Sequence, residues 1–235
     1  MKEIVCLSGW AQKPSSLESI FDDREFFDVS VSSYNYLKHS SIENFFEAFS
    51  RKYQKLDCLV GWSLGGQLAV RLIAKKIIKP KLLVLIAPPF QFVKNSHIKA
   101  AMPHSSYQEF LENFKKSPDA ALKKFSILAI LNDANAKIII DNLALEDASS
   151  KSLVYWLEEL GRFSCFDINF ENFPETLYFH GSGDMIVYPS QKDYFKERIS
   201  SFTEVVVEKA GHAPHLSNVE KIRAYVDKFF RQKLY

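Results

Sequence analysis

The chain has few cysteines, no long apolar run and almost no net charge. Its three cysteines, Cys6, Cys58 and Cys165, are widely scattered and form neither a metal-binding spacing nor a disulfide framework. The longest apolar runs, such as residues 82–87, fall far short of the roughly 20 residues that a membrane-spanning helix needs. A net charge of +2 favours neither nucleic acid nor a membrane surface as a partner. We therefore expect no metal, no cofactor, no membrane and no nucleic acid.

What remains is the composition of a folded protein. Hydrophobic residues make up 47% of the 235 residues, which is enough for a core, and no low-complexity tract indicates disorder. Residues 1–10 lack the apolar run and cleavage site of a secretion signal, so we expect a cytoplasmic protein. A chain of this length is most economically one domain. We expect a monomer, because no long exposed strand edge or coiled-coil pattern is present.

Apolar strand-like segments alternate with helical patterns along most of the chain. Strands are predicted at residues 4–7, 26–34, 56–60, 81–89, 176–180 and 204–208, and helices at residues 42–53, 64–78, 189–199 and 219–230. Strands that are apolar throughout and alternate with helices are typical of a parallel sheet covered on both faces. The sequence therefore predicts an α/β fold with a mostly parallel sheet.

One interval interrupts this alternation. Residues 90–172 contain no convincing strand, only helical patterns at residues 105–116, 118–131, 133–145 and 150–162. A parallel sheet needs only a short crossover there, so we interpret residues 90–172 as an inserted helical cap. The core then comprises residues 1–89 and 173–235. The cap follows the carboxyl end of a strand, where open α/β sheets bind ligands.

The segment Gly61-Trp62-Ser63-Leu64-Gly65 fits the pattern G-x-S-x-G, between a predicted strand and a predicted helix. In that context the pattern is a nucleophile elbow, a tight turn that projects the serine hydroxyl above the sheet. Glycines are needed on either side because a side chain there would collide with neighbouring backbone. We therefore predict that Ser63 is a nucleophile.

A serine nucleophile needs a base and a third group that orients the base. On a sheet of this kind the partners follow in the order serine, acid, histidine, each just past a strand. Asp184 follows the strand predicted at residues 176–180, and His212 follows the strand predicted at residues 204–208. We predict Asp184 as the acid and His212 as the base.

Other titratable residues compete for these roles. His180 lies at the end of its own strand, and His215 lies three residues past His212, so a structural role is expected for both. Asp167 precedes its strand by too many residues to reach the carboxyl edge of the sheet.

The negative oxygen that forms during acyl transfer needs two backbone N–H donors. Leu64, directly after the nucleophile, would supply one of them. The second is expected from the loop after the first strand, and we predict the N–H of Trp10; an exposed loop aromatic is the competing interpretation.

Four motifs together resemble the α/β-hydrolase superfamily, and within it the family of pimeloyl-acyl-carrier-protein methyl ester carboxylesterases. They are LSGW at residues 7–10, GWSLGG at residues 61–66, GSGDMIV at residues 181–187 and GHAP at residues 211–214. The resemblance covers nearly the whole chain and implies the α/β-hydrolase fold with a helical cap. It implies hydrolysis of the methyl ester of pimeloyl-acyl-carrier protein in biotin biosynthesis, through an acyl-enzyme.

The resemblance also implies contacts with the substrate. Trp10 and Leu64 would frame the ester, and a cap helix would line the acyl channel through Phe125, Leu128 and Ala129. Ordinary cap packing is the alternative explanation for these three residues. The family holds its acidic carrier protein with cations on the cap. The candidates here are Lys115, Lys116, Lys123 and Lys124.

Two departures from the family pattern bear on the substrate. Ser8-Gly9 stands where the superfamily usually has His-Gly, and the cap is rich in lysine rather than arginine, which removes bidentate pairing with carboxylate or phosphate. A generalist short-chain carboxylesterase or thioesterase is therefore an alternative. A menaquinone-pathway lyase uses the same three residues, but would need several cations near the site. A non-catalytic binding protein on this fold is less expected, since all three positions of the triad are present.

Overall fold

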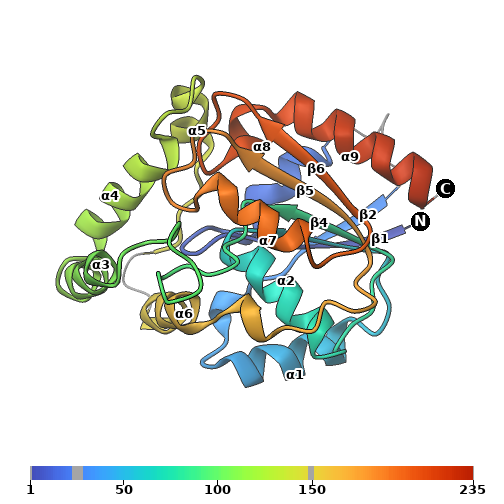
Figure 1. Cartoon of the computed structure of the whole chain (residues 1–235), viewed down its shortest axis with the longest axis horizontal. Helices are drawn as coiled ribbons and strands as arrows, with labels where there is room; N and C mark the ends of the chain where they lie inside the picture. Colours follow the sequence, from blue (N-terminus) through green and yellow to red (C-terminus); the bar gives the residue numbers. More distant parts are fainter. Residues whose placement is uncertain (1, 23–28, 148–150, 235) are drawn as a thin grey trace.

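The sheet of the computed structural model has six strands, all parallel, in the order β2-β1-β3-β4-β5-β6 (Figure 1). The structure describes residues 2–22, 29–147 and 151–234. The strands are β1 (Lys2–Leu7), β2 (Val29–Ser33), β3 (Cys58–Trp62), β4 (Leu82–Ile86), β5 (Glu175–Gly181) and β6 (Phe202–Val207). The four from β1 to β5 in the middle of this order are largely buried, as expected for a sheet covered on both faces.

Helices cover both faces of the sheet (Figure 1). One face packs against α1 (Ile42–Lys52), α2 (Leu64–Ala74) and α7 (Lys192–Lys196), and the other against η1 (Pro14–Ile20), α8 (Pro214–Ser217) and α9 (Val219–Lys233). Side chains alternate between the faces within a strand: in β3, Leu59 joins the first cluster, whereas Cys58 and Val60 join the second. The sheet is therefore packed between two apolar layers, which fix the position of each strand end.

The helices of the cap gather beyond the carboxyl ends of the strands (Figure 1). They are α3 (His104–Lys116), α4 (Pro118–Ile130), α5 (Ala136–Asn142) and α6 (Lys151–Arg162). Pro118 occupies the first turn of α4, where a helix needs no backbone N–H, and the Ser117 side chain makes no capping hydrogen bond. On α6, Leu153, Trp156, Leu157 and Leu160 are buried along one face, so this helix packs firmly on the core.

Two buried polar anchors hold the cap region to the core. The Arg71 guanidinium of α2 donates two hydrogen bonds to a Glu159 carboxylate oxygen of α6, both at 3.0 Å, and lies over the ring of Phe163. The Gln191 side chain accepts the N–H groups of Phe90 and Gln91, at 2.8 and 3.2 Å. The chain thus leaves the sheet after β4 along a fixed path.

The boundaries of several elements differ from those predicted. Of the strand predicted at residues 26–34, residues 26–28 lie outside the described residues, and β2 covers Val29–Ser33. The helix predicted at residues 64–78 ends at Ala74, because Lys76 adopts a positive φ of 57°. The helix predicted at residues 189–199 is a 3-10 turn, η4 (Pro189–Gln191), followed by the short α7. The helix predicted at residues 133–145 is only Ala136–Asn142.

Within the described residues, the structure has no helix of the length and apolarity needed to cross a membrane.

Candidate active site

The turn that bears Ser63 is tight because three glycines let backbone segments approach each other. Ser63 itself has φ 53° and ψ −120°, a conformation that an L-residue rarely adopts. A Cβ on Gly61 would lie 2.5 Å from the Gly66 Cα, and one on Gly65 would lie 2.1 Å from the Leu7 carbonyl oxygen. Neither position accepts a side chain without moving backbone. The strained turn therefore places Ser63 at the carboxyl end of β3 and at the start of α2.

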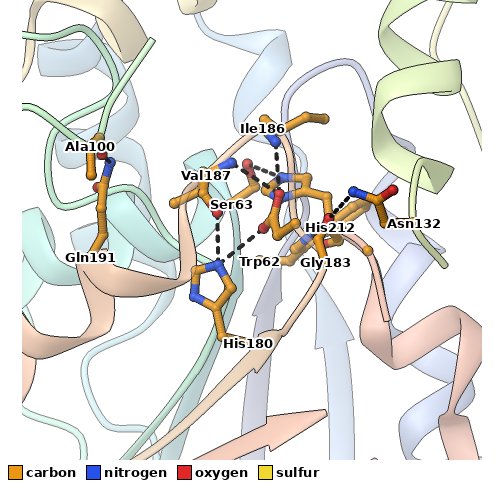
Figure 2. Close-up of polar contacts among 12 residues, drawn as sticks. Trp62, Ser63, Ala100, Asn132, His180, Gly183, Ile186, Val187, Gln191 and His212 are labelled. Atoms are coloured by element: carbon orange, nitrogen blue, oxygen red, sulfur yellow. Dashed lines mark hydrogen bonds and ion pairs between the residues drawn. The ribbon is translucent and has the colours of Figure 1, made fainter. Parts of the chain in front are cut away.

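Ser63, His212 and Asp184 come together from three separate loops, and Figure 2 shows Ser63 and His212 in this arrangement. The Ser63 hydroxyl lies 2.9 Å from His212 Nε2, and His212 Nδ1 lies 2.7 Å from an Asp184 carboxylate oxygen. All three side chains are buried. These distances are those that a base needs in order to take a proton from serine while a carboxylate fixes the tautomer of the base.

Asp184 is held as an anion. Its Oδ1 accepts the backbone N–H groups of Ile186 and Val187 at 2.8 and 3.0 Å, which leaves Oδ2 to face the histidine. Burial opposes the ionisation of Asp184, but the charge of His212 and hydrogen bonds from His180 and His212 hold the pKa of the carboxyl well below its usual range. The acid is therefore charged throughout the neutral range.

His180 contributes to the site in a way that its position in the sequence did not reveal. Its Nε2 lies 2.9 Å from the Val187 carbonyl oxygen and 3.1 Å from Asp184 Oδ2, so this nitrogen carries the proton (Figure 2). Its Nδ1 then accepts the Tyr178 hydroxyl at 2.8 Å. The prediction that His180 is not the base agrees with this geometry. The ring instead supports the carboxylate at Oδ2, the same oxygen that faces His212 Nδ1.

His215 is a buried histidine that faces an aromatic ring. Its ring centroid lies 4.5 Å from that of Trp62, and neither ring nitrogen has a hydrogen-bond partner among the described residues. Burial, assisted by the neighbouring His212, lowers the pKa of His215 to about 3. It is therefore a neutral packing residue. Within the described ranges, no group of three or more His, Cys, Asp or Glu side chains is placed to hold a metal ion.

Trp62 fixes the histidine loop to the nucleophile turn. Its indole N–H donates to the His212 carbonyl oxygen at 3.0 Å. The base and the nucleophile are thus tied together by main-chain and side-chain contacts besides their own hydrogen bond. Trp62 is part of the G-x-S-x-G motif. Its hydrogen bond joins residues that are 150 positions apart, so the motif alone does not indicate it.

The two predicted N–H donors lie on the expected elements. Leu64 is the first residue of α2, where the N–H has no acceptor earlier in the helix. The Trp10 indole donates to the Leu153 carbonyl oxygen at 2.8 Å and packs edge-on against Phe114 and Phe125. The indole is therefore committed to packing, and the Trp10 backbone N–H stays the predicted second donor.

A very small pocket of about 10 Å³ lies beside Ser63. Its lining comprises Gly9, Trp10, Gln12, Trp62, Ser63, Phe125, Ser126, Ala129, Leu143 and His212. Phe125 and Ala129 line it as predicted, but Leu128 does not and is 37% exposed. Ser126 takes part instead. The prediction that Leu128 contacts the substrate is therefore not supported by its position.

Gln12 is a pocket residue that the sequence analysis missed. Its side chain is 2% exposed, and among the described residues nothing donates to its Oε1. Buried polar groups are usually paired, so an unpaired amide oxygen beside a reactive serine is suited to a polar group of a ligand. No local motif distinguishes Gln12 from any other loop glutamine.

The end of the cap helix α4 is hydrogen-bonded to the catalytic loops. The Ala129 carbonyl oxygen accepts the His212 N–H at 3.1 Å, and an Asp133 carboxylate oxygen accepts the Gly211 N–H at 2.7 Å. Asn132 also reaches the Gly183 carbonyl oxygen at 3.3 Å (Figure 2). The carboxyl end of α4 therefore forms one unit with the loops that bear the acid and the base.

The four predicted cap lysines are not equivalent. Lys115 lies 3.1 Å from a Glu158 carboxylate oxygen and 3.9 Å from one of Glu112, so it is already paired. Lys116, Lys123 and Lys124 are exposed on α3 and α4. Lys123 also lines a groove between α4 and α5.

The fold and this arrangement are those of a hydrolase built on a parallel sheet, with Ser63 at the position predicted for the nucleophile. A family model described as the alpha/beta hydrolase family matches residues 4–224. The chain belongs to the alpha/beta hydrolase family. The fold class expected from the sequence is confirmed.

Several curated relatives resemble the chain at low identity. The biotin biosynthesis bifunctional protein BioHC of Teredinibacter turnerae is 25% identical over 254 residues. The match covers 98% of the present chain but only 45% of the length of BioHC. The pimeloyl-acyl-carrier-protein methyl ester esterase of Nitrosomonas europaea is 24% identical over 238 residues, covering 96% of the chain and 94% of that protein. The resemblance stated from the motifs is thus confirmed at about this level of identity.

Solved structures share the fold. An esterase from Exiguobacterium antarcticum superimposes with a TM-score of 0.83 at 17% identity, covering 98% of the chain and 92% of that structure. A bromoperoxidase from Bacillus anthracis gives the same TM-score and coverage at 16% identity. Because these two proteins differ in their named activities, the likeness establishes the fold and leaves the substrate to the site.

Proposed function

We propose that the protein is a serine carboxylesterase in which Ser63 is the nucleophile, His212 the general base and Asp184 the acid that orients it. The observation that carries this proposal is the continuous chain of hydrogen bonds from Ser63 through His212 to Asp184, at 2.9 and 2.7 Å. The strained elbow and the buried, anionic Asp184 support the same roles.

Acylation follows from these distances. The Ser63 oxygen attacks the carbonyl carbon of the ester while its proton passes to His212 Nε2. The negative oxygen of the tetrahedral intermediate faces the N–H groups of Leu64 and Trp10. The bond to the alcohol oxygen then breaks, and His212 returns the proton to that oxygen, so that the alcohol leaves and an acyl-serine remains.

Deacylation repeats these steps with water. His212 takes a proton from the water as its oxygen attacks the acyl carbon. The second intermediate collapses by breaking the bond to the Ser63 oxygen, which regains the proton from His212. The carboxylic acid leaves with the water oxygen, and the enzyme returns to its starting state.

For the substrate, we propose the methyl ester of pimeloyl-acyl-carrier protein, so that the reaction belongs to biotin synthesis and releases methanol. The names of the two relatives above support this assignment, as do the sequence motifs. The exposed Lys116, Lys123 and Lys124 are proposed contacts for the acidic carrier protein.

A generalist short-chain carboxylesterase or thioesterase is the second candidate. The observation in its favour is the small size of the pocket beside Ser63. At about 10 Å³, the pocket by itself has no room for a long acyl chain. The two candidates share one mechanism and differ only in the acyl group and its attachment.

Hydrolysis of pimeloyl-acyl-carrier-protein methyl ester and of p-nitrophenyl butyrate, with Ser63→Ala run beside the wild type, tests these proposals. We expect turnover of both esters by the wild type and a loss of about 10⁴-fold or more in Ser63→Ala. Turnover of the small ester alone would favour the generalist. Activity that survives in Ser63→Ala would contradict the assigned nucleophile.

A further inference from the structure

A second, much larger hollow lies on the cap, next to the pocket at Ser63. It has a volume of about 610 Å³, within the range of sites that bind small molecules. Its lining is mainly apolar and comprises Leu122, Ile127, Ile130, Ile140, Leu143 and Leu145. We call this hollow, between α4, α5 and residues 143–147, the α4–α5 groove.

The α4–α5 groove adjoins the site at two residues. Ser126 and Leu143 line both the groove and the pocket beside Ser63. The pocket itself has space for about one water-sized group, whereas an ester consists of a reacting carbonyl and two substituents. The larger substituent therefore requires space beyond the pocket, and the groove begins at its wall.

Main-chain hydrogen bonds join the groove to the loop that bears the predicted N–H donor. The Lys13 N–H donates to the Ala144 carbonyl oxygen at 2.6 Å, and the Glu146 N–H donates to that of Ala11 at 2.9 Å. Gln12 and Leu145 form the antiparallel bridge between these contacts. One wall of the groove is therefore fixed to the loop of residues 10–13, which also lines the serine pocket.

The side chains of the groove specify the chemistry of its occupant. The apolar lining offers little to a charged or strongly polar chain. Among the described lining residues, the carboxylates of Asp119 and Glu146 outnumber the cation Lys123, so a free carboxylate would meet net repulsion. Ile127 and Ile140 are 52% and 59% exposed, which leaves apolar surface for an apolar group to cover.

We propose that the α4–α5 groove binds the aliphatic, uncharged chain of the ester substrate and thereby sets a preference for chain length. This inference rests on the proposed serine esterase function and specifies the substrate class of the same site. Each methylene group that enters the groove is expected to raise kcat/KM by up to about fourfold, the value of burying one CH₂. Ser126 and Leu143 form the passage between the reacting carbon and the groove.

A chain-length series of p-nitrophenyl esters tests the proposal, with kcat/KM measured for the acetate, butyrate, hexanoate and octanoate. Ile127→Trp and Ile140→Trp fill the groove from opposite walls, and Ile138→Trp is the matched control, since Ile138 is exposed on α5 but does not line the groove. We expect kcat/KM to rise with chain length in the wild type. The octanoate-to-butyrate ratio should fall about tenfold in both groove variants and stay at the wild-type value in Ile138→Trp.

The outcomes separate the two levels of inference. If Ser63-dependent hydrolysis is present but the ratio is unchanged in both groove variants, the groove proposal is wrong and the esterase proposal stands. If the wild type hydrolyses none of the esters, or if hydrolysis does not depend on Ser63, both proposals fail. Thermal unfolding of each variant identifies one that does not fold, and the variant on the opposite wall then decides the result.

Discussion

The loops of the core and the outer helices of the cap differ in how completely their side chains are buried and paired. Around Ser63, the acid and the base are almost fully buried, and both oxygens of Asp184 have hydrogen-bond partners. On α4 and α5, by contrast, Ile127, Ile138 and Ile140 are about half exposed. The core thus holds a fixed chemical apparatus, while the cap leaves apolar surface open. We infer that the core determines the reaction and the cap determines the chain on which it acts.

The contact between the two regions lies at the carboxyl end of α4. Ala129 and Asp133 accept N–H groups from the histidine loop, so this end of the cap cannot move without disturbing His212. The side of α4 that lines the groove carries no comparable set of bonds to the catalytic loops among those described. Changes in the core should therefore alter every substrate equally, and changes in the cap should alter substrates selectively.

The largest expected effect comes from Asp184→Asn. An asparagine keeps the size of the side chain but can present an N–H to His212 Nδ1, which favours the wrong tautomer of the base. We expect kcat to fall about 10⁴-fold for all esters alike. Steady-state kinetics with the butyrate and octanoate esters measure this. A loss that differed strongly between the two esters would break the proposed division between core and cap.

The next effect is on stability and comes from His215. The pKa of this buried ring is about 3, against about 6.5 in an unfolded chain, so the unfolded state binds a proton that the folded state refuses. Stability is therefore lost as the pH falls below about 6.5, by about 2 kcal/mol between pH 7 and pH 5. Asp184 does not oppose this, because its lowered pKa keeps it charged over the same range.

Urea unfolding of the wild type and of His215→Phe at about pH 7 and pH 5 measures this difference. We expect the phenylalanine variant to lose less stability on acidification by about 2 kcal/mol. His104→Phe, on the exposed start of α3, is the control. It should lose as much stability between pH 7 and pH 5 as the wild type does. Equal losses in the wild type and in His215→Phe would show that this ring takes up a proton without unfolding.

The parallel sheet and the positions of Ser63, Asp184 and His212 along it could be predicted from the sequence, because they follow from local rules. A strand, a glycine turn and a helix locate Ser63, and the positions after β5 and β6 locate Asp184 and His212. These residues need only the order of elements along the chain. Their mutual distances then follow from the parallel sheet, whose carboxyl ends meet at one edge.

The substrate-facing side of α4 was only partly accessible. Ala121, Leu122, Phe125 and Ala129 form its buried side, and Leu128 lies about 75° around the helix from the middle of that side. Periodicity alone groups Leu128 with Phe125, because the two are three residues apart. Which edge of the helix turns inward depends on how the cap packs on the core, and no local pattern specifies it.

Gln12 and His180 were inaccessible for a related reason. His180 serves Asp184 because both side chains reach the same point after the turn that follows β5. Gln12 lines the site because its loop pairs with Leu145, more than a hundred residues away in the chain. Each role depends on contacts between segments and leaves no signature in residue spacing.

A smaller effect is expected from His180→Phe. This change removes the N–H that faces Asp184 Oδ2 and Val187 while keeping an aromatic ring. We expect kcat/KM to fall about tenfold, the value of one hydrogen bond to a charged group. The carboxylate then interacts more strongly with His212, so the acid limb of the pH profile of kcat/KM should move to higher pH.

Two further variants separate positioning from general damage. His180→Gln retains a side-chain N–H donor and should recover part of the activity. Tyr178→Phe removes only the hydroxyl that faces the far nitrogen of the ring and should have a weaker effect on the pH profile. A fall in rate with no movement of the acid limb in His180→Phe would mean that this residue acts through packing alone.

The smallest expected effect concerns the carrier protein and comes from reversing the charge of exposed lysines on the cap. Lys116→Glu with Lys124→Glu reverses two exposed charges on neighbouring helices and leaves the groove lining unchanged. We expect kcat/KM for pimeloyl-acyl-carrier-protein methyl ester to fall about threefold at low salt, and the difference to shrink as salt is added. Hydrolysis of p-nitrophenyl butyrate, which carries no charge, should not change.

The matched control is Lys55→Glu with Lys79→Glu, which makes the same change of charge on the core. If that pair slows the carrier-bound ester as much as the cap pair does, net charge accounts for the effect and the cap lysines have no special position. If only the cap pair does so, the carrier protein meets the helices that also form the α4–α5 groove. The cap would then recognise both ends of one substrate, the chain through its apolar side chains and the carrier through its lysines.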